Sequence, residues 1–178
     1  MFYIVKANET ILFDKEFKAE GIMMLQSARL DTSSSTGSAA IELVSAPGNT
    51  LLQIAFRPYE NIITFNHRPL GGMWGPELAI PFQGQFQDIL EPSVTIYDHG
   101  DRYQILVDYK TVFYFYKRLR ENATAVRFIR ENSRHPLFAE ALGVNVYPSF
   151  RHIFPNAKYY EPVRISRKQA EFGRKTLL

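Results

Sequence analysis

The stretch SVTIYDHGDRYQILVDYKTVFYFYKR, from Ser93 to Arg118, decides the fold. Its apolar members alternate with more polar neighbours at Val94, Ile96, Tyr103, Ile105 and Val107. Alternation with a period of two puts apolar side chains on one face of a strand. The segments DHGD at 98–101 and DYKT at 108–111 hold the residue types that tight turns use. The stretch therefore predicts a three-stranded β-meander with one buried face.

Short apolar runs of the same kind occur on both sides of the meander, separated by turn residues. They lie at 1–5, 21–30, 39–45, 51–56, 61–66 and 144–150. The segment 121–132 fits either a short helix or a strand, and the spacing of Val126 and Phe128 favours the strand. Many short strands without long helical patterns predict an all-β protein built as an antiparallel sandwich or jelly roll.

The composition bounds the class of protein. The chain has 178 residues, of which 46% are hydrophobic, enough for one domain with a sizeable core. It contains no cysteine, so disulfides and thiolate metal sites are excluded. The first residues lack the pattern of a signal peptide, and no apolar run reaches the length of a membrane helix. We therefore expect a cytoplasmic protein without membrane insertion.

Basic charge is concentrated at the end of the chain. From residue 156 onward six basic residues stand against two acidic ones, although the whole chain has a net charge of only +3. We predict a folded domain over 1–155 and a basic C-terminal extension over 156–178. The extension lacks the interleaved aromatics of a nucleic-acid surface, so no nucleic-acid partner is expected.

The only tryptophan, Trp74, stands between a glycine pair and Gly-Pro in a predicted loop. An indole exposed there offers a flat platform for the C–H face of a sugar ring. Sugar hydroxyls then need donors and acceptors, because leaving them unpaired costs about 1–3 kcal/mol each. An alternative for Trp74 is a ring folded back onto the core.

Polar side chains surround this loop in the predicted strands. Gln53, Ala55 and Arg57 have the same parity and share one strand face, while Asn66 ends the next run and Glu77 follows the tryptophan. Antiparallel pairing of these two strands would bring the polar groups together. Purely structural readings remain open for them: an ion pair for Arg57 with Glu77, and a turn cap for Asn66.

The segment LLQIAFRPYENIITFNHRPLGGMWGPELAIPF, residues 51–82, resembles the carbohydrate-recognition segment of the galectins. The forms ENIITFN and WGPE, with the meander, resemble the fungal branch, especially its chitooligosaccharide-binding member. The resemblance covers roughly residues 2 to 150. It implies a galectin-like jelly-roll sandwich of two antiparallel sheets. It also assigns carbohydrate binding to Arg57, Asn66, Trp74 and Glu77.

Three positions depart from the pattern that this resemblance supplies. Gln53 stands in place of a histidine that reads a galactose hydroxyl, Ala55 in place of an asparagine, and Ala79 in place of an arginine that clamps Glu77. We therefore expect weak lactose binding and a Glu77 without its clamp. Gln53 is kept as a candidate site residue with altered preference. Arg68 is a further candidate, for which a solvated surface position is the alternative.

The function implied is that of a non-catalytic lectin for β-galactosides or N-acetylhexosamine-containing oligosaccharides. The resemblance also implies a homo-oligomer, a tetramer in the fungal branch. The resemblance further implies export to the extracellular matrix or cell wall without a signal peptide, and a role in defence. The alternative is a galectin scaffold that has lost sugar binding and serves as a protein-interaction module.

Catalysis and cofactors have little support in the sequence. A glycosidase needs a pair of carboxylates across the scissile bond, and Glu77 has no second carboxylate in the motif. His99 between Asp98 and Asp101 fits a hairpin turn better than a metal site. We expect no catalytic residue, no metal and no cofactor.

Overall fold

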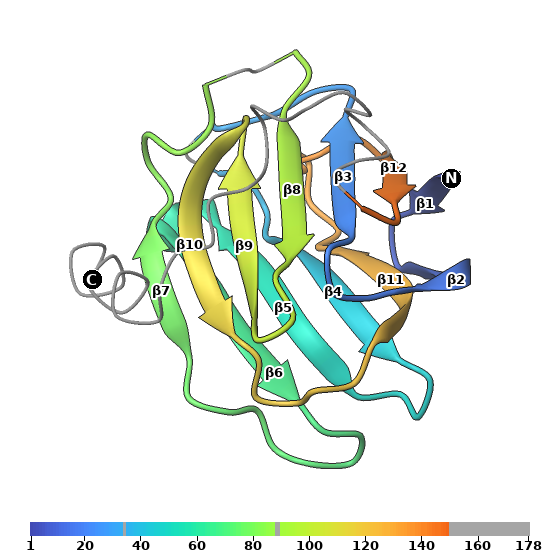
Figure 1. Cartoon of the computed structure of the whole chain (residues 1–178). Coiled ribbons are helices and arrows are strands. Elements are labelled where there is room, and N and C mark those ends of the chain that lie inside the picture. The colour runs from blue at the N-terminus through green and yellow to red at the C-terminus, as the bar shows by residue number, and fades with distance from the viewer. Residues whose placement is uncertain (34, 88–89, 150–178) are drawn as a thin grey trace.

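The computed structural model describes residues 1–33, 35–87 and 90–149. These residues form two six-stranded antiparallel sheets stacked face to face (Figure 1). The front sheet of Figure 1 has the order β1 (Phe2–Lys6), β12 (Ala141–Tyr147), β3 (Ile22–Ser27), β8 (Ser93–Asp98), β9 (Arg102–Val107), β10 (Lys110–Tyr116). The back sheet has the order β2 (Glu9–Phe17), β11 (Ala123–Arg130), β4 (Ala39–Ser45), β5 (Thr50–Arg57), β6 (Ile62–Arg68), β7 (Leu78–Pro81).

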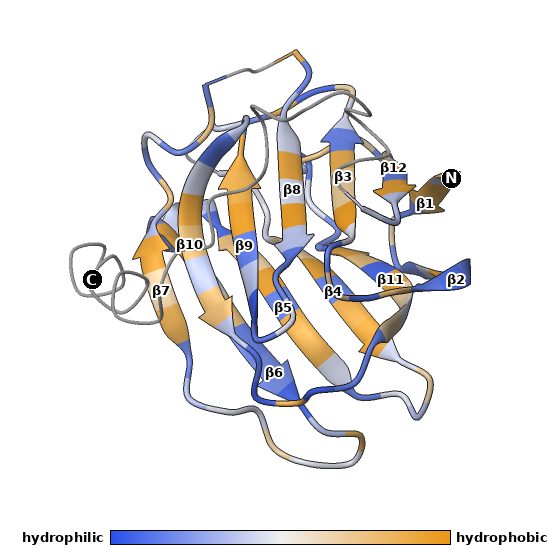
Figure 2. Cartoon of the chain, viewed as in Figure 1, coloured by the Kyte–Doolittle hydropathy of each residue, from blue (hydrophilic) through white to orange (hydrophobic). Residues whose placement is uncertain are grey.

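The core lies between the two sheets and consists mainly of aliphatic and aromatic side chains. Figure 2 shows apolar positions recurring along the strands of both sheets. Phe65 of β6 stacks on Phe113 of β10, with ring centroids 4.2 Å apart and planes 5° from parallel. This stack joins the two sheets at β6, the strand that also carries Asn66. The all-β sandwich predicted from the sequence is confirmed.

The predicted meander is β8, β9 and β10, and its predicted inward residues are buried. Asp108 and Tyr109 connect β9 to β10 with φ values of 46° and 68°. Two successive left-handed residues are typical of the tightest hairpin turns. Gly100, with φ of 91°, occupies the turn between β8 and β9. The turn reading of residues 98–101 is therefore confirmed.

Two elements differ from the sequence prediction, and one ambiguity is resolved. Strand β2 was not predicted, because its charged residues 14–16 are exposed at a sheet edge and break the apolar alternation. Strand β12 begins at Ala141, three residues before the predicted run. The segment that fitted either a helix or a strand is β11. A short 3₁₀ turn, Pro58–Glu60, links β5 to β6.

No helix in the part of the chain that the structure describes is long and apolar enough to cross a membrane. The predicted boundary between residues 155 and 156, and the basic extension after it, lie outside the described residues.

Candidate functional site

The register of β5 and β6 places the predicted polar side chains on the outer face of the back sheet. Gln53 pairs with Asn66, and Ala55 pairs with Thr64. On the other side of β6, Thr64 pairs with Ala79 of β7. Small side chains therefore flank Thr64 on both sides and form a low floor between larger polar groups.

An ion pair spans this floor from one side of β6 to the other. The Arg57 guanidinium, on β5, donates to both oxygens of Glu77, just before β7, at 3.1 and 3.4 Å. Side-chain exposures of 32% and 43% leave both groups open to solvent. The expectation that Glu77 has no clamp is wrong, because Arg57 reaches it from β5, on the far side of β6; the ion pair of Arg57 with Glu77 that the sequence left open is present.

Trp74 lies in the loop between β6 and β7, with 40% of its surface exposed. The Arg68 guanidinium lies 5.5 Å from the centre of its ring. Arg68 also donates from Nε to the Gly72 carbonyl at 3.0 Å. Arg68 is thus more than a solvated residue, since it ties the strand end to the loop and contacts the indole.

Asn66 fastens the tryptophan loop to β6. Its Nδ2 donates to the Gly75 carbonyl at 2.8 Å, and its Oδ1 accepts from the His67 backbone N–H at 2.9 Å. The Arg118 guanidinium donates to the same Oδ1 at 3.1 Å. Asn66 is buried, so much of its hydrogen-bonding capacity serves the loop itself. The turn-cap role expected for Asn66 is therefore present, but the segment that it holds is the tryptophan loop.

Gln53 is held by a residue that the sequence analysis did not single out. Its Nε2 donates to Glu42 Oε1 at 2.8 Å. The other Glu42 oxygen accepts from Arg127 Nη1 at 3.0 Å, and Arg127 Nε donates to Thr10 Oγ1 at 3.0 Å. A polar row therefore crosses five strands from Thr10 to Asn66.

His67 lies beside the loop, with its Nδ1 3.2 Å from Arg118 Nη1. A guanidinium can only donate, so Nδ1 accepts and the ring is neutral. Burial, and then the Arg118 charge, hold the pKa of His67 below its usual value of 6.5.

We expect acid to weaken this corner of the site. The unfolded chain binds a proton on His67 more readily than the folded chain, so the free energy of unfolding should fall as the pH drops below 6.5. Denaturant titrations at pH 7.5 and 5.5 measure the loss. His99, whose pKa burial also lowers, contributes separately, so the variant His67→Gln isolates the effect and should lose less stability. Equal losses in the two proteins would contradict it.

Gly75 is required by close packing next to the tryptophan. A Cβ there would overlap the His67 ring and stand 2.7 Å from Arg118 Nη1. We expect Gly75→Ala to destabilise the domain by about 1–3 kcal/mol through overpacking, and to weaken ligand binding by shifting Trp74. Thermal melts and binding assays measure the two effects. Gly143→Ala is the control, because its nearest contact is an ordinary 3.4 Å. Equal behaviour of the two variants would refute the packing argument.

The group at 98–101 is structural. Asp98 is fully buried, and its two oxygens accept from Lys117 Nζ at 2.7 Å and from the Gly100 N–H at 2.7 Å. His99 instead contacts the Tyr97 ring and shares a hydrogen bond with Gln104. Among residues 1–33, 35–87 and 90–149 no group of three or more His, Cys, Asp or Glu could hold a metal.

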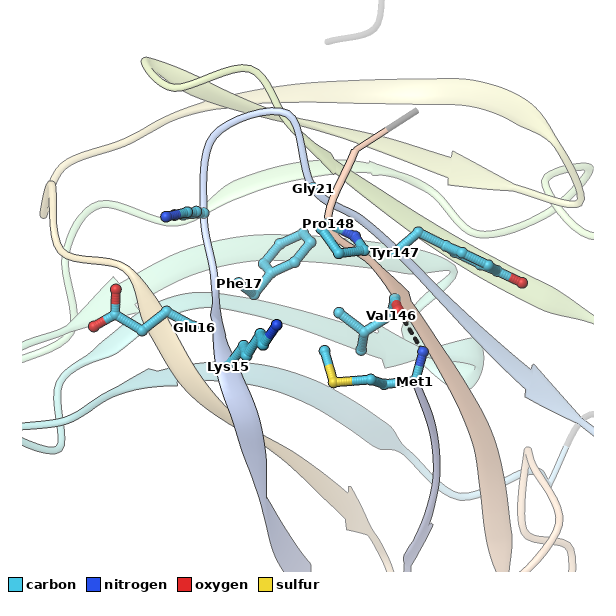
Figure 3. Close-up of a pocket in the computed structure, with 9 residues that line it drawn as sticks. Met1, Lys15, Glu16, Phe17, Gly21, Val146, Tyr147 and Pro148 are labelled. Atoms are coloured by element: carbon cyan, nitrogen blue, oxygen red, sulfur yellow. Dashed lines mark hydrogen bonds between the residues drawn. The ribbon is translucent and has the colours of Figure 1, made fainter. Parts of the chain in front are cut away.

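A hollow of about 300 Å³ lies elsewhere, next to β2 and β12 (Figure 3). Its wall includes Met1, Phe17, Val146 and Pro148, with Lys15 and Lys18 beside them. Strand β2 is at the opposite edge of the back sheet from β7. The hollow is therefore separate from the tryptophan site.

Known proteins are similar in sequence to this domain. The family model described as Galactoside-binding lectin matches residues 3–137. Galectin-1 of Coprinopsis cinerea is 41% identical over 147 residues, which is 83% of this chain and 94% of that protein. Galectin-2 of Coprinopsis cinerea is 40% identical over 147 residues, again 83% and 94% of the two chains.

Solved structures share the fold. The crystal structure of Caenorhabditis elegans galectin LEC-6 matches with a TM-score of 0.63 and 16% identity, over 82% of this chain and 95% of that one. Chicken galectin 2 matches with a TM-score of 0.60 and 17% identity, over 76% and 96% of the two chains.

Proposed function

Since this chain belongs to the galactoside-binding lectin family, whose members are non-catalytic carbohydrate-binding proteins, we propose that it binds a β-linked oligosaccharide on the outer face of the back sheet. The ligand is a β-galactoside or an N-acetylhexosamine-containing oligosaccharide. Trp74 stacks under one ring, and the polar groups of β5, β6 and the β6–β7 loop hold the hydroxyls.

The observation that supports this most is the open indole of Trp74, three residues before a glutamate that is ion-paired with Arg57. Trp74 stays 40% exposed although the fold has a large apolar core in which to bury it. Arg57 and Glu77 meet across β6, where one supplies donors and the other acceptors. A sugar ring needs this combination of an apolar platform and paired polar groups. Asn66 supports the platform by holding the loop.

Affinity at one such site is modest by this proposal, because a shallow polar groove releases little apolar surface. We therefore propose that the chain acts as a homo-oligomer, since several linked sites raise avidity without new contacts. Synthesis in the cytosol, export without a signal peptide, and a role in defence are further proposals that rest on the likeness to fungal galectins.

A glycan array tests the function. The folded wild-type chain is expected to bind a restricted set of oligosaccharides that end in β-linked galactose or N-acetylhexosamine. Titration calorimetry with the best hit then gives the affinity, and comparison with lactose tests the expected weak lactose binding. A folded chain that binds no glycan on the array or at millimolar concentration would instead favour a scaffold that has lost sugar binding.

A further inference from the structure

Glu42 is almost completely shielded from water, although it lies on the outer face of the back sheet. Only 4% of its side chain is exposed. It pairs with Gln53 on β5 and with Arg127 on β11, so the two neighbours cover it from both sides. Both of its oxygens accept hydrogen bonds, one from each neighbour.

This arrangement fixes which end of the Gln53 amide faces the carboxylate. A carboxylate that is ion-paired with a guanidinium can only accept, so the amide nitrogen must turn toward it. The Gln53 oxygen then turns away from Glu42. Among the described residues no side chain or backbone group donates a hydrogen bond to that oxygen. Gln53 is half-buried and next in register to Asn66, so the oxygen lies beside the proposed sugar site.

We infer that Glu42 is a positioning residue that locks the Gln53 amide with its oxygen toward the ligand, so that this position selects a ligand hydroxyl that donates a hydrogen bond. The inference deepens the proposed function and rests on it. Its chemical consequence is a preference for ligands whose hydroxyl at this point is free. An analogue with fluorine or an O-methyl group there cannot donate and should be rejected.

The first test needs no ligand. Nitrogen-15 NMR of the free wild-type chain should show slow exchange and a displaced shift for the Gln53 side-chain amide. The exposed Gln26 on β3 serves as the reference. In Glu42→Gln a carboxamide can either donate or accept, so the Gln53 signal should move toward that of Gln26. Fast exchange of Gln53 in the wild type would overturn the inference.

The second test uses the best oligosaccharide from the array and analogues in which one hydroxyl at a time is replaced by fluorine. In the wild type, one replacement should weaken binding about tenfold or more. In Glu42→Gln the same replacement should cost less than about threefold. Equal discrimination in the two proteins would overturn the inference.

A second variant keeps the test valid if Glu42→Gln folds poorly. Gln53→Leu removes the acceptor but leaves the Glu42–Arg127 pair in place, and should also lose the discrimination. If Gln53→Leu discriminates between the analogues as the wild type does, Gln53 does not select the ligand hydroxyl. If NMR shows a locked Gln53 but no glycan binds, the proposed function fails while the positioning role of Glu42 stands.

Discussion

Replacing Trp74 with alanine is expected to weaken oligosaccharide binding about 10- to 100-fold and to leave the melting temperature almost unchanged. The ring is 40% exposed and is not a member of the buried core. Its removal therefore takes away the stacking surface under the sugar but little of the packing that stabilises the domain. The hydrogen bonds that hold the loop, from Asn66 to Gly75 and from Arg68 to Gly72, do not involve the indole, whose contact with the Arg68 guanidinium lies at the exposed surface.

The effect of Trp74→Ala on glycan affinity can be distinguished from the effect of removing any exposed aromatic side chain. Tyr109, 67% exposed in the turn between β9 and β10, gives the matched control. Tyr109→Ala should bind glycans as the wild type does. Affinity is measured by titration calorimetry and folding by thermal melts. If Trp74→Ala binds as tightly as the control, the indole is not the platform and the proposed site is misplaced.

The fold could be predicted from the sequence where every second side chain of a strand belongs to the apolar core. Val94, Ile96 and Ile105 belong to it, whereas the more polar residues between them do not, although those of β8 are buried as well. β2 escaped prediction for the opposite reason. It lies at the edge of the back sheet, and most of its side chains are exposed. Ile11, Phe13 and Phe17 still pack against the core, but the charged residues 14–16 interrupt their alternation.

The candidate site could be predicted only where its members lie close in sequence. Arg57, Asn66, Trp74 and Glu77 lie within one stretch of two strands and a loop, and the contacts of Arg57 with Glu77 and of Asn66 with Gly75 form inside that stretch. Arg118 contacts Asn66 from a segment 52 residues away, and no local sequence pattern predicts that contact.

Glu42 could have been noticed from its local sequence. It is the only charged residue in the run AAIELVS, and a charge buried in such a run needs a partner of opposite charge or a hydrogen-bond donor. Its partner Arg127 could not have been found in this way. The pairing of β4 with β11 depends on a strand order that crosses most of the chain. The clamp of Glu77 is a different case, because its partner Arg57 is only 20 residues away and the sequence had offered that ion pair as one reading.

The largest loss of stability is expected from Lys117→Met, which removes one half of a buried ion pair. Lys117 and Asp98 have side-chain exposures of 4% and 0%, and their atoms Nζ and Oδ2 are 2.7 Å apart. The Lys117 ammonium also lies 4.7 Å from the centre of the Tyr103 ring. Burial, and then the nearby Asp98 charge, raise the pKa of Tyr103 well above its usual range, so the phenol adds no second negative charge beside Asp98.

Lys117→Met should therefore lower the free energy of unfolding by about 3–5 kcal/mol, because it leaves a buried carboxylate without its cation. The double variant Asp98→Asn/Lys117→Met should recover more than half of that loss, because the uncompensated charge is gone while an oxygen remains to accept from the Gly100 N–H. Denaturant titrations measure both variants. Lys110→Met, at an exposed position of β10, controls for the loss of one positive charge.

The result also bears on the sugar site, because Arg118 follows Lys117 directly and donates to Asn66 Oδ1. If the buried pair anchors this segment, Lys117→Met should also weaken glycan binding under conditions in which the variant is still folded. If Lys117→Met is no less stable than the control Lys110→Met, the ion pair contributes little to stability. A double variant as unstable as the single one would place the loss in the packing of Lys117 rather than in the exposed charge of Asp98.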